Sequence, residues 1–229
     1  MPRQSPIKGF GTLTPLQKEF IGILASLPDQ NQFYLARGTA LAEYYLGHRL
    51  SFDLDYFTGV ENLVLPTSYQ IESACQKKSL PLKVIRRFST FVEFLVEREN
   101  ESLKIGLALD SPYRFEQPVL SGEGIFVNDY PDLRVDKLLT YFGRAEPRDA
   151  VDLFFIIQRE PLEPLLELAV QKDPGFDNYW FALALNRCEN FPDELERWPV
   201  KMLQPFEPRL LKQTLLDWAV KLMDKAMKK

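Results

Sequence analysis

The segment 52–57 (FDLDYF) constrains the fold of this chain more than any other feature of its sequence. Apolar and acidic side chains alternate along it, and a period of two is typical of a β-strand with one buried face. Asp53 and Asp55 therefore project from the same face. Two adjacent carboxylates repel each other unless a cation bridges them, and Mg²⁺ commonly binds one or two carboxylates together with substrate phosphates. The pattern favours either a metal platform or a strand whose polar face lies in water.

A glycine turn precedes this acidic strand. Residues 33–36 (FYLA) suit a short buried strand, Gly38 interrupts it, and residues 39–46 read as a helix. Glycine lets the backbone approach a phosphate closely, and the first turn of a helix offers free N–H groups. Thr39 adds a hydroxyl that either binds the phosphate or caps the helix. Together, the turn and the acidic strand predict a phosphate cradle beside a metal-binding face, which suits phosphoryl or nucleotidyl transfer.

The loop between this helix and the acidic strand carries a histidine and an arginine. His48 is the single histidine of the chain. It is either a structural loop residue, which we favour, or a catalytic base or phosphate contact. Arg49 either pairs with Asp53 or Asp55 or reaches a phosphate with its planar fork of donors.

The remaining elements predict an α+β chain with two domains. Helices are expected near 14–24, with Thr14 as N-cap and Pro15 in the first turn, and at 67–79. Strands are expected at 82–88, 90–96, 103–109 and 124–127, with a loop at 111–124 and a poorly ordered lead-in at 1–12. After Pro131 we expect only helices, at 135–142, 149–158, 161–171, 177–188 and 207–228. The prediction is an α/β domain over residues 1–130 and a helical domain over residues 131–229.

Composition excludes several classes of protein. The 229 residues carry a formal net charge of −4, which neither establishes nor excludes nucleic-acid binding. Cys75 and Cys188 fit no zinc pattern and suit packed thiols in a reducing compartment. The chain has no apolar run of the ~20 residues that a membrane span needs, and its first residues lack the apolar block of a signal peptide. We therefore expect a cytoplasmic protein with no membrane partner.

Two longer runs resemble a known family. Residues 37–57 (RGTALAEYYLGHRLSFDLDYF) resemble the glycine–Thr-Ala-Leu and His-Arg-x-Ser-x-Asp-x-Asp motifs of the AbiEii/AbiGii nucleotidyltransferase-like toxin family. Residues 136–155 (DKLLTYFGRAEPRDAVDLFF) resemble its Lys-Leu helix and the Arg-x-x-x-Arg-Asp-x-x-Asp-Leu segment that follows. The resemblance covers residues 33–157. It implies a nucleotidyltransferase-like mixed β-sheet domain with flanking helices, followed by a helical C-terminal domain.

The resemblance also implies roles for individual residues. Asp53 and Asp55 would hold Mg²⁺ and act in catalysis, and Lys137 would reach the triphosphate unless it is a solvated helix lysine. The nucleotide-binding set would be Arg37, Gly38, Thr39, Arg49 and Ser51. A third set, which we take as a structural ion-pair cluster rather than a catalytic one, shares one helix face: Arg148, Asp149 and Asp152.

The chain departs from the family pattern at two positions. Arg37 stands where the family has the first glycine of a pair, so it either obstructs the nucleotide or supplies a phosphate contact. Gly106 stands where nucleotidyltransferases carry a third carboxylate on a later strand. Asp110 has the same parity but lies about 13 Å further along an extended strand. Glu93 on the preceding strand is the other candidate.

Three functions follow from these observations. The first is transfer of a nucleoside monophosphate from an NTP to an acceptor hydroxyl, with tRNA or another RNA as acceptor and an antitoxin or neighbouring gene product as partner. Basic residues available for an RNA backbone are Lys83, Arg86, Arg87, Lys221, Lys225, Lys228 and Lys229. The second is a catalytically degenerate scaffold that binds nucleotides or a protein partner. The third is protein interaction through the C-terminal helices, where the aromatic-rich segment 176–198 is either a partner surface or, more commonly, core.

Overall fold

The computed structural model describes residues 5–98 and 101–227, so Lys228 and Lys229 lie outside it. The expected α+β class is confirmed. The contacts divide the chain into two compact units, Met1–Tyr130 and Pro131–Lys229, which are described separately below. Within the described residues, no helix is long and apolar enough to cross a membrane.

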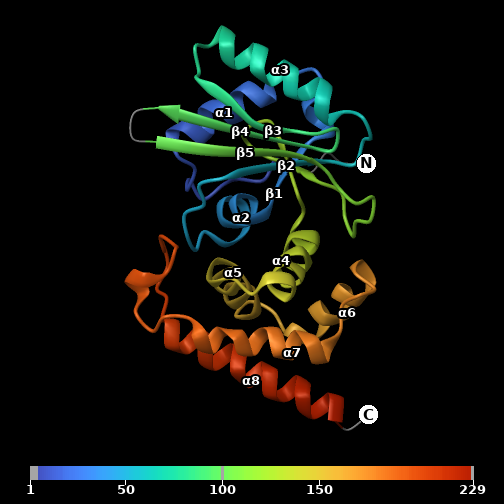
Figure 1. Cartoon of the computed structure of the whole chain (residues 1–229), viewed down its shortest axis with the longest axis vertical. Coiled ribbons are helices and arrows are strands. Elements are labelled where there is room, and N and C mark those ends of the chain that lie inside the picture. Colours follow the sequence, from blue (N-terminus) through green and yellow to red (C-terminus); the bar gives the residue numbers. More distant parts are fainter. Residues whose placement is uncertain (1–4, 99–100, 228–229) are drawn as a thin grey trace. The chain divides into compact units, whose positions relative to one another are not determined.

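The first unit is built on a seven-stranded mixed sheet in the order β3-β4-β5-β2-β1-β7-β6 (Figure 1). At its centre β2 runs antiparallel to β1 and parallel to β5. The short strand β6 corrects the expectation of an uninterrupted loop over 111–124. The bounds are β1 (Tyr34–Ala36), β2 (Leu54–Thr58), β3 (Leu82–Arg87), β4 (Phe91–Arg98), β5 (Glu101–Leu109), β6 (Val119–Leu120) and β7 (Phe126–Val127).

Three helices flank this sheet. Helices α1 (Pro15–Ala25) and α3 (Val64–Lys77) cover one face, and α2 (Arg37–Leu41), which continues as a π-helix over Ala42–Leu46, lies on the other (Figure 1). The start of α1 is as predicted. The Thr14 hydroxyl accepts a hydrogen bond from the Gln17 backbone N–H, and the Gln17 side chain accepts one from the Thr14 N–H.

Buried and more exposed residues alternate along the central strands, so one face of the sheet is core and the other is not. The residues that face α1 and α3 are fully or almost fully buried: Leu54, Tyr56, Val92, Phe94, Val96, Leu103, Ile105 and Leu107. The alternate residues of the same strands point to the opposite face and remain half-buried or exposed, apart from the buried Gly106. We call this second face, which includes Asp55, Gly106 and Glu93, the open face of the sheet.

The N-terminal segment is ordered where the structure describes it, so the expectation of a poorly ordered lead-in is wrong for residues 7–12. Ile7 pairs with the β6 edge through the carbonyl of Leu120. The buried carboxylate of Glu43 accepts hydrogen bonds from the backbone N–H groups of Gly11 (2.9 Å) and Thr12 (2.5 Å). This long-range carboxylate fixes the segment against the π-helix. Residues 1–4 lie outside the described part of the chain.

The second unit is helical. It contains α4 (Tyr130–Arg144), α5 (Pro147–Ile157), α6 (Leu162–Lys172), α7 (Asn178–Asn186) and α8 (Pro208–Met227). In the aromatic-rich segment, Phe176, Phe181 and Trp198 are buried, while Trp180 is 60% exposed. The segment therefore supplies some core residues, but Tyr179 and Trp180 lie on the surface, so it is core in part only.

Candidate functional site

The glycine turn and the acidic strand are neighbours in the sheet. Strand β1 pairs antiparallel with β2, and Ala36 lies opposite Asp55. The chain leaves β1 at the next residue and turns through Arg37 and Gly38 into α2. Adjacent strands are about 4.8 Å apart, so the turn lies beside the two aspartates, as the sequence motifs require.

Arg37 occupies a backbone conformation that favours glycine. Its φ is 57°, in the left-handed region, which costs a non-glycine residue roughly 1–2 kcal/mol. The side chain is exposed, and its guanidinium carbon lies 5.2 Å from the centre of the Phe57 ring. A glycine at this position, as in the family pattern, would adopt the backbone conformation without strain. In this chain Arg37 adopts the strained conformation and places a positive charge beside the turn.

Gly38 makes room for two polar side chains. A Cβ atom at this position would lie 2.8 Å from Arg49 Nη2 and 3.1 Å from Ser51 Oγ. The first distance is shorter than a Cβ atom tolerates, and the second would require Ser51 to shift slightly. Arg49 is 5% exposed and cannot swing away into solvent. The glycine therefore lets a guanidinium and a hydroxyl gather against the turn, where both can donate to an anion.

Two hydrogen bonds hold the residues that lead into β2. The Thr39 hydroxyl donates to the Asp53 carbonyl from α2, and the Gln17 side-chain amide donates to the Ser51 carbonyl from α1 at 2.9 Å. The N-cap of α2 is Ala36, so Thr39 does not cap this helix. Its phosphate contact stays a prediction. Gln17 was missed as a positioning residue, although its Thr-x-x-Gln capping signature was visible in the sequence.

The two loop residues between α2 and β2 are buried. His48 has no exposed surface, which favours the structural role over that of a catalytic base. The Arg49 side chain donates through Nη1 to the Leu50 carbonyl at 2.9 Å.

Asp53 and Asp55 suit a magnesium ion. Both are half-buried on the open face, because Leu54 and Tyr56 between and after them are buried in the core. Two carboxylates at this spacing are enough protein ligands for Mg²⁺, because its remaining ligands come from water and substrate phosphates. No group of three or more His, Cys, Asp or Glu side chains suited to a metal occurs in residues 5–98 and 101–227.

Gly106 lies directly beside Asp55. The two residues are paired across β2 and β5, and Glu93 on β4 is paired with Gly106 on its other side. A Cβ at Gly106 would lie 3.0 Å from Asp55 Oδ1. The position expected to carry a third carboxylate is thus next to Asp55, and in this chain it has no side chain; the Phe91 ring lies 3.8 Å from where a Cβ would be. Glu93 lies two strand spacings from Asp55, or about 10 Å between Cα atoms.

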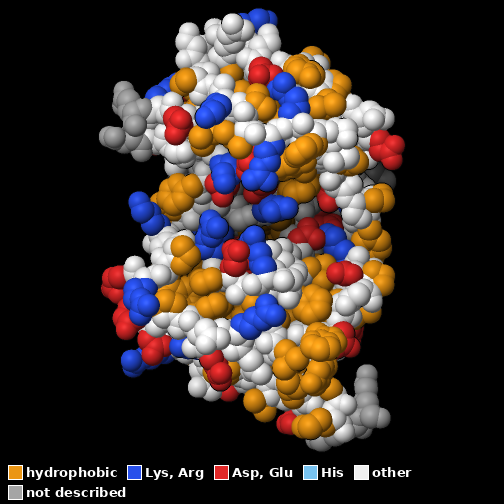
Figure 2. Space-filling view, viewed as in Figure 1, with side chains coloured by type: hydrophobic (Ala, Val, Ile, Leu, Met, Phe, Trp, Pro, Cys, Tyr) orange, Lys and Arg blue, Asp and Glu red, His pale blue; other side chains and the backbone are white. Residues whose placement is uncertain are grey.

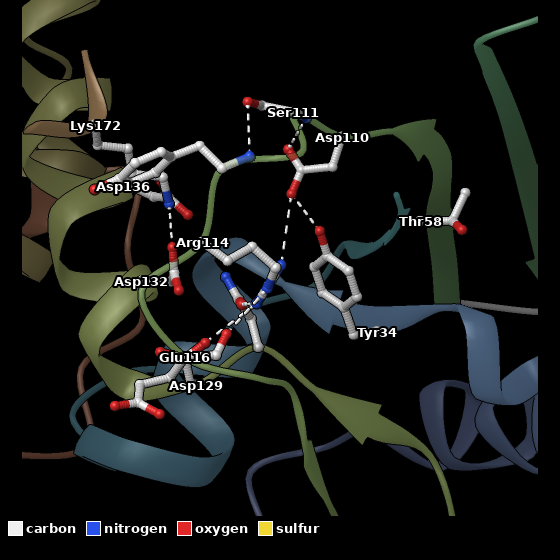
Figure 3. Close-up of polar contacts among 12 residues, drawn as sticks. Tyr34, Thr58, Asp110, Ser111, Arg114, Glu116, Asp129, Asp132, Asp136 and Lys172 are labelled. Atoms are coloured by element: carbon white, nitrogen blue, oxygen red, sulfur yellow. Dashed lines mark hydrogen bonds and ion pairs between the residues drawn. The ribbon is translucent and has the colours of Figure 1, made fainter. Parts of the chain in front are cut away.

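Asp110 is committed to another network. The Tyr34 hydroxyl donates to it, and Arg114 Nη1 lies 3.7 Å from its carboxylate (Figure 3). Arg114 also donates to Asp129 at 3.1 Å and lies over the Tyr34 ring. Asp110 follows Leu109, whose partner Thr58 ends β2, so it lies beyond the strand that carries Asp55.

Lys137 is the centre of a buried ion cluster in the second unit. Its Nζ lies 3.0 Å from Asp149 Oδ1 and 2.9 Å from Asp152 Oδ2, and its side chain is 8% exposed. The alternative of a solvated helix lysine is therefore wrong. Arg144 Nε lies 2.7 Å from Asp149 Oδ2. Burial alone would raise the pKa of Asp149, but Arg144 and Lys137 outweigh it and hold that pKa below its ordinary 3.8.

The expected structural cluster has different cations from those inferred. Asp149 and Asp152 do belong to an ion cluster, but Arg148 is exposed and makes no ion pair with a described residue. The cations come from α4, which the helical spacing within α5 cannot reveal. The role of Lys137 toward a triphosphate stays a prediction.

The fold defined by this sheet and its flanking helices is nucleotidyltransferase-like. MenT4, a nucleotidyltransferase toxin from Mycobacterium tuberculosis, is similar with a TM-score of 0.62 and 18% identity, over 91% of this chain and 82% of that one. JHP933 from Helicobacter pylori is similar with a TM-score of 0.61 and 18% identity, over 93% and 91%. The Aquifex aeolicus protein aq_aa25 is 28% identical over 184 residues, which span 79% of this chain and 84% of that protein. No protein-family model matches the chain.

Proposed function

We propose that this protein binds a nucleoside triphosphate with Mg²⁺ and transfers the nucleoside monophosphate to an acceptor hydroxyl. The observation that carries the proposal is the pairing of Ala36 with Asp55, which brings the Arg37–Gly38 turn beside the Asp53–Asp55 platform. Arg49 and Ser51 gather against the same turn. Donors for phosphate oxygens and ligands for a divalent cation thus meet at one place on the open face.

Each group has a distinct part in this reaction. Mg²⁺ held by Asp53 and Asp55 would neutralise phosphate charge and align the triphosphate. Arg49, Ser51 and the N–H groups of the turn bind the phosphate oxygens, and Arg37 is placed to contact them from the exposed side. The acceptor oxygen forms a bond to the α-phosphorus while the bond to the β-phosphate bridging oxygen breaks. Pyrophosphate leaves, and the hydroxyl proton passes to solvent.

The acceptor that we propose to test first is the 3′ end of tRNA or another RNA. The resemblance to the AbiEii/AbiGii toxins supports this choice. The same resemblance suggests a toxin role in a toxin–antitoxin or phage-defence system, with the product of a neighbouring gene as antitoxin. Co-purification with that product is the direct test of the partner.

The activity is tested by incubating the protein with each labelled NTP, Mg²⁺ and total tRNA. We expect label transfer that stops when EDTA removes the metal. An Asp53→Asn/Asp55→Asn variant keeps the shape of both side chains and should transfer no label. A matched control is Asp110→Asn, because Asp110 belongs to the Tyr34–Arg114 network. Equal transfer by the wild type and the Asp53/Asp55 variant would contradict the proposal.

Gly106 favours a second candidate, a nucleotide-binding module without turnover. With glycine beside Asp55, the position that would complete a three-carboxylate site has no side chain. This candidate predicts NTP binding that depends on Mg²⁺ but no label transfer to any acceptor. Calorimetric titration with NTP and Mg²⁺, run beside the transfer assay, separates the two candidates.

A further inference from the structure

A row of paired residues leads from the metal platform to the edge of the sheet. Asp55 pairs with Gly106, Gly106 with Glu93, and Glu93 with Arg86 on strands β2, β5, β4 and β3. Paired residues project to the same face of a sheet. Arg86 therefore lies on the open face, in line with Asp55, and Gly106 lies between Asp55 and the Glu93–Arg86 pair.

A β-bulge places Arg86 on this face. The register of β3 against β4 shifts between Val84 and Arg86, so Ile85 has no partner in the ladder. In a regular strand, Lys83 and Ile85 would share the open face and Arg86 would point to the core side. The extra residue reverses that parity for Arg86. Bulges occur next to active sites, where they re-aim a side chain.

A second cation joins Arg86. Lys104 lies on the open face, two residues before Gly106. Leu54 pairs with Ile105, so Lys104 lies alongside Asp53, the residue before Leu54. Glu93 holds both cations: its carboxylate lies 3.3 Å from Arg86 Nε and 3.8 Å from Lys104 Nζ. The Glu93 side chain is 13% exposed, whereas those of Arg86 and Lys104 are 62% and 59% exposed. This triad of Arg86, Glu93 and Lys104 thus presents two anchored but accessible cations. Figure 2 shows basic side chains gathered at the level of the sheet.

The triad lies on the acceptor side of the metal platform. The turn at Gly38 follows β1, on one side of β2, whereas β5, β4 and β3 lie on the other side. In nucleotidyl transfer the attacking hydroxyl and the leaving pyrophosphate lie on opposite sides of the α-phosphorus, roughly in line. If the turn binds the β- and γ-phosphates, the hydroxyl approaches across β5. The triad is therefore next to the acceptor.

We propose that Arg86 and Lys104 bind phosphates of a single-stranded nucleic-acid acceptor and so guide its terminal hydroxyl toward Asp55, with Glu93 as the positioning residue that holds them. The inference rests on the proposed function for the direction of approach. Two cations on one surface suit consecutive phosphates of a strand, because each can neutralise one phosphate and release its counterions. Gly106 itself adds no side chain between the triad and Asp55, and the Phe91 ring lies 3.8 Å from where its Cβ would be.

The test is binding of a fluorescent single-stranded RNA oligonucleotide with a free 3′ hydroxyl, measured by anisotropy at several salt concentrations. The variant is Arg86→Gln/Lys104→Gln, which keeps donors for Glu93 but removes both charges. We expect affinity to fall roughly tenfold. The slope of log affinity against log salt should become shallower by about 1.4, since each phosphate contact to a single strand contributes about 0.7. Affinity for Mg²⁺–NTP should stay within about twofold of the wild type.

The matched control is Lys77→Gln/Lys78→Gln, which removes the same charge from the end of α3. Both lysines are exposed, and α3 covers the opposite face of the sheet. We expect this variant to bind the oligonucleotide like the wild type. Equal losses in both variants, an unchanged salt slope in the Arg86/Lys104 variant, or no oligonucleotide binding by the wild type would overturn the inference.

The measurement of Mg²⁺–NTP affinity distinguishes a failure of the acceptor assignment from a failure of the proposed function. If the Arg86/Lys104 variant loses Mg²⁺–NTP affinity as strongly as oligonucleotide affinity, the triad serves the nucleotide and the acceptor assignment is wrong. If the wild type binds the oligonucleotide through the triad but binds no Mg²⁺–NTP, the proposed function fails while the phosphate-binding role of the triad stands.

Discussion

Replacing Gly106 with aspartate tests whether Asp55 belongs to a metal platform. The new Cβ would lie 3.0 Å from Asp55 Oδ1, so the new carboxylate must lie within a few ångströms of the existing one. Two like charges about 4 Å apart repel by about 1 kcal/mol in water and about 4 kcal/mol at an effective dielectric constant near 20. Because Asp55 is half-buried, we expect about 2 kcal/mol of repulsion without metal. A bridging Mg²⁺ should convert this repulsion into tighter metal binding.

The assay is thermal unfolding of Gly106→Asp and Gly106→Asn, each in EDTA and in millimolar Mg²⁺. Asparagine has the same shape and meets the same crowding, so the difference between the two variants isolates the charge. In EDTA the aspartate variant should melt lower than the asparagine variant, by roughly 2–4 °C per kcal/mol of difference. In Mg²⁺ the gap should close or reverse, since ligand binding stabilises the folded state. An identical response of the two variants to Mg²⁺ would refute the reasoning.

Further predictions concern the turn, the buried cluster and the thiols. Arg37→Gly should be more stable than Arg37→Ala by about 1 kcal/mol in denaturant unfolding, because only glycine adopts a φ of 57° without strain; a more stable alanine variant would argue against it. Lys137→Met should destabilise the protein by about 3–5 kcal/mol at neutral pH, since it leaves buried carboxylates without their cation. Because the folded-state pKa of Asp149 is depressed, its stabilisation is present above the ordinary 3.8 and is lost as pH falls through the folded-state value. Unfolding measured from neutral pH down to about pH 3 should show that loss in the wild type and a smaller one in Lys137→Met. Cys75 and Cys188, whose pKa values burial raises to about 11, should react with a thiol reagent at pH 8 only after unfolding; rapid labelling of the native protein would contradict this.

Local patterns predicted the parts of the site that lie close together in the sequence. The alternation of apolar and acidic residues over 52–57 predicted that Asp53 and Asp55 lie on one face of a strand. A capping pattern predicted Thr14 as the N-cap of α1. The family pattern placed Gly106 at the position of a third carboxylate, and in the sheet Gly106 pairs with Asp55. These inferences succeed because strand parity and helix capping depend on neighbouring residues alone.

Contacts between distant elements were not predictable in the same way. The bulge at Ile85 reverses the parity of Arg86, and no residue type in β3 marks it. The carboxylate of Glu43 orders residues 11 and 12 from more than thirty positions away. The partners of Asp149 come from α4 rather than from the neighbouring Arg148. These three features depend on tertiary packing. A single sequence does not show which side chains from distant elements will be in contact.

In the proposed function, the Arg37–Gly38 turn and the Asp53–Asp55 pair form one nucleotide site. Calorimetric titration of the wild type and of Asp53→Asn/Asp55→Asn with NTP, in Mg²⁺ and in EDTA, tests it most directly. We predict binding by the wild type in Mg²⁺, and loss of that binding both in EDTA and in the variant. Binding that survives the loss of both carboxylates, or no binding by the wild type in Mg²⁺, would contradict the claim.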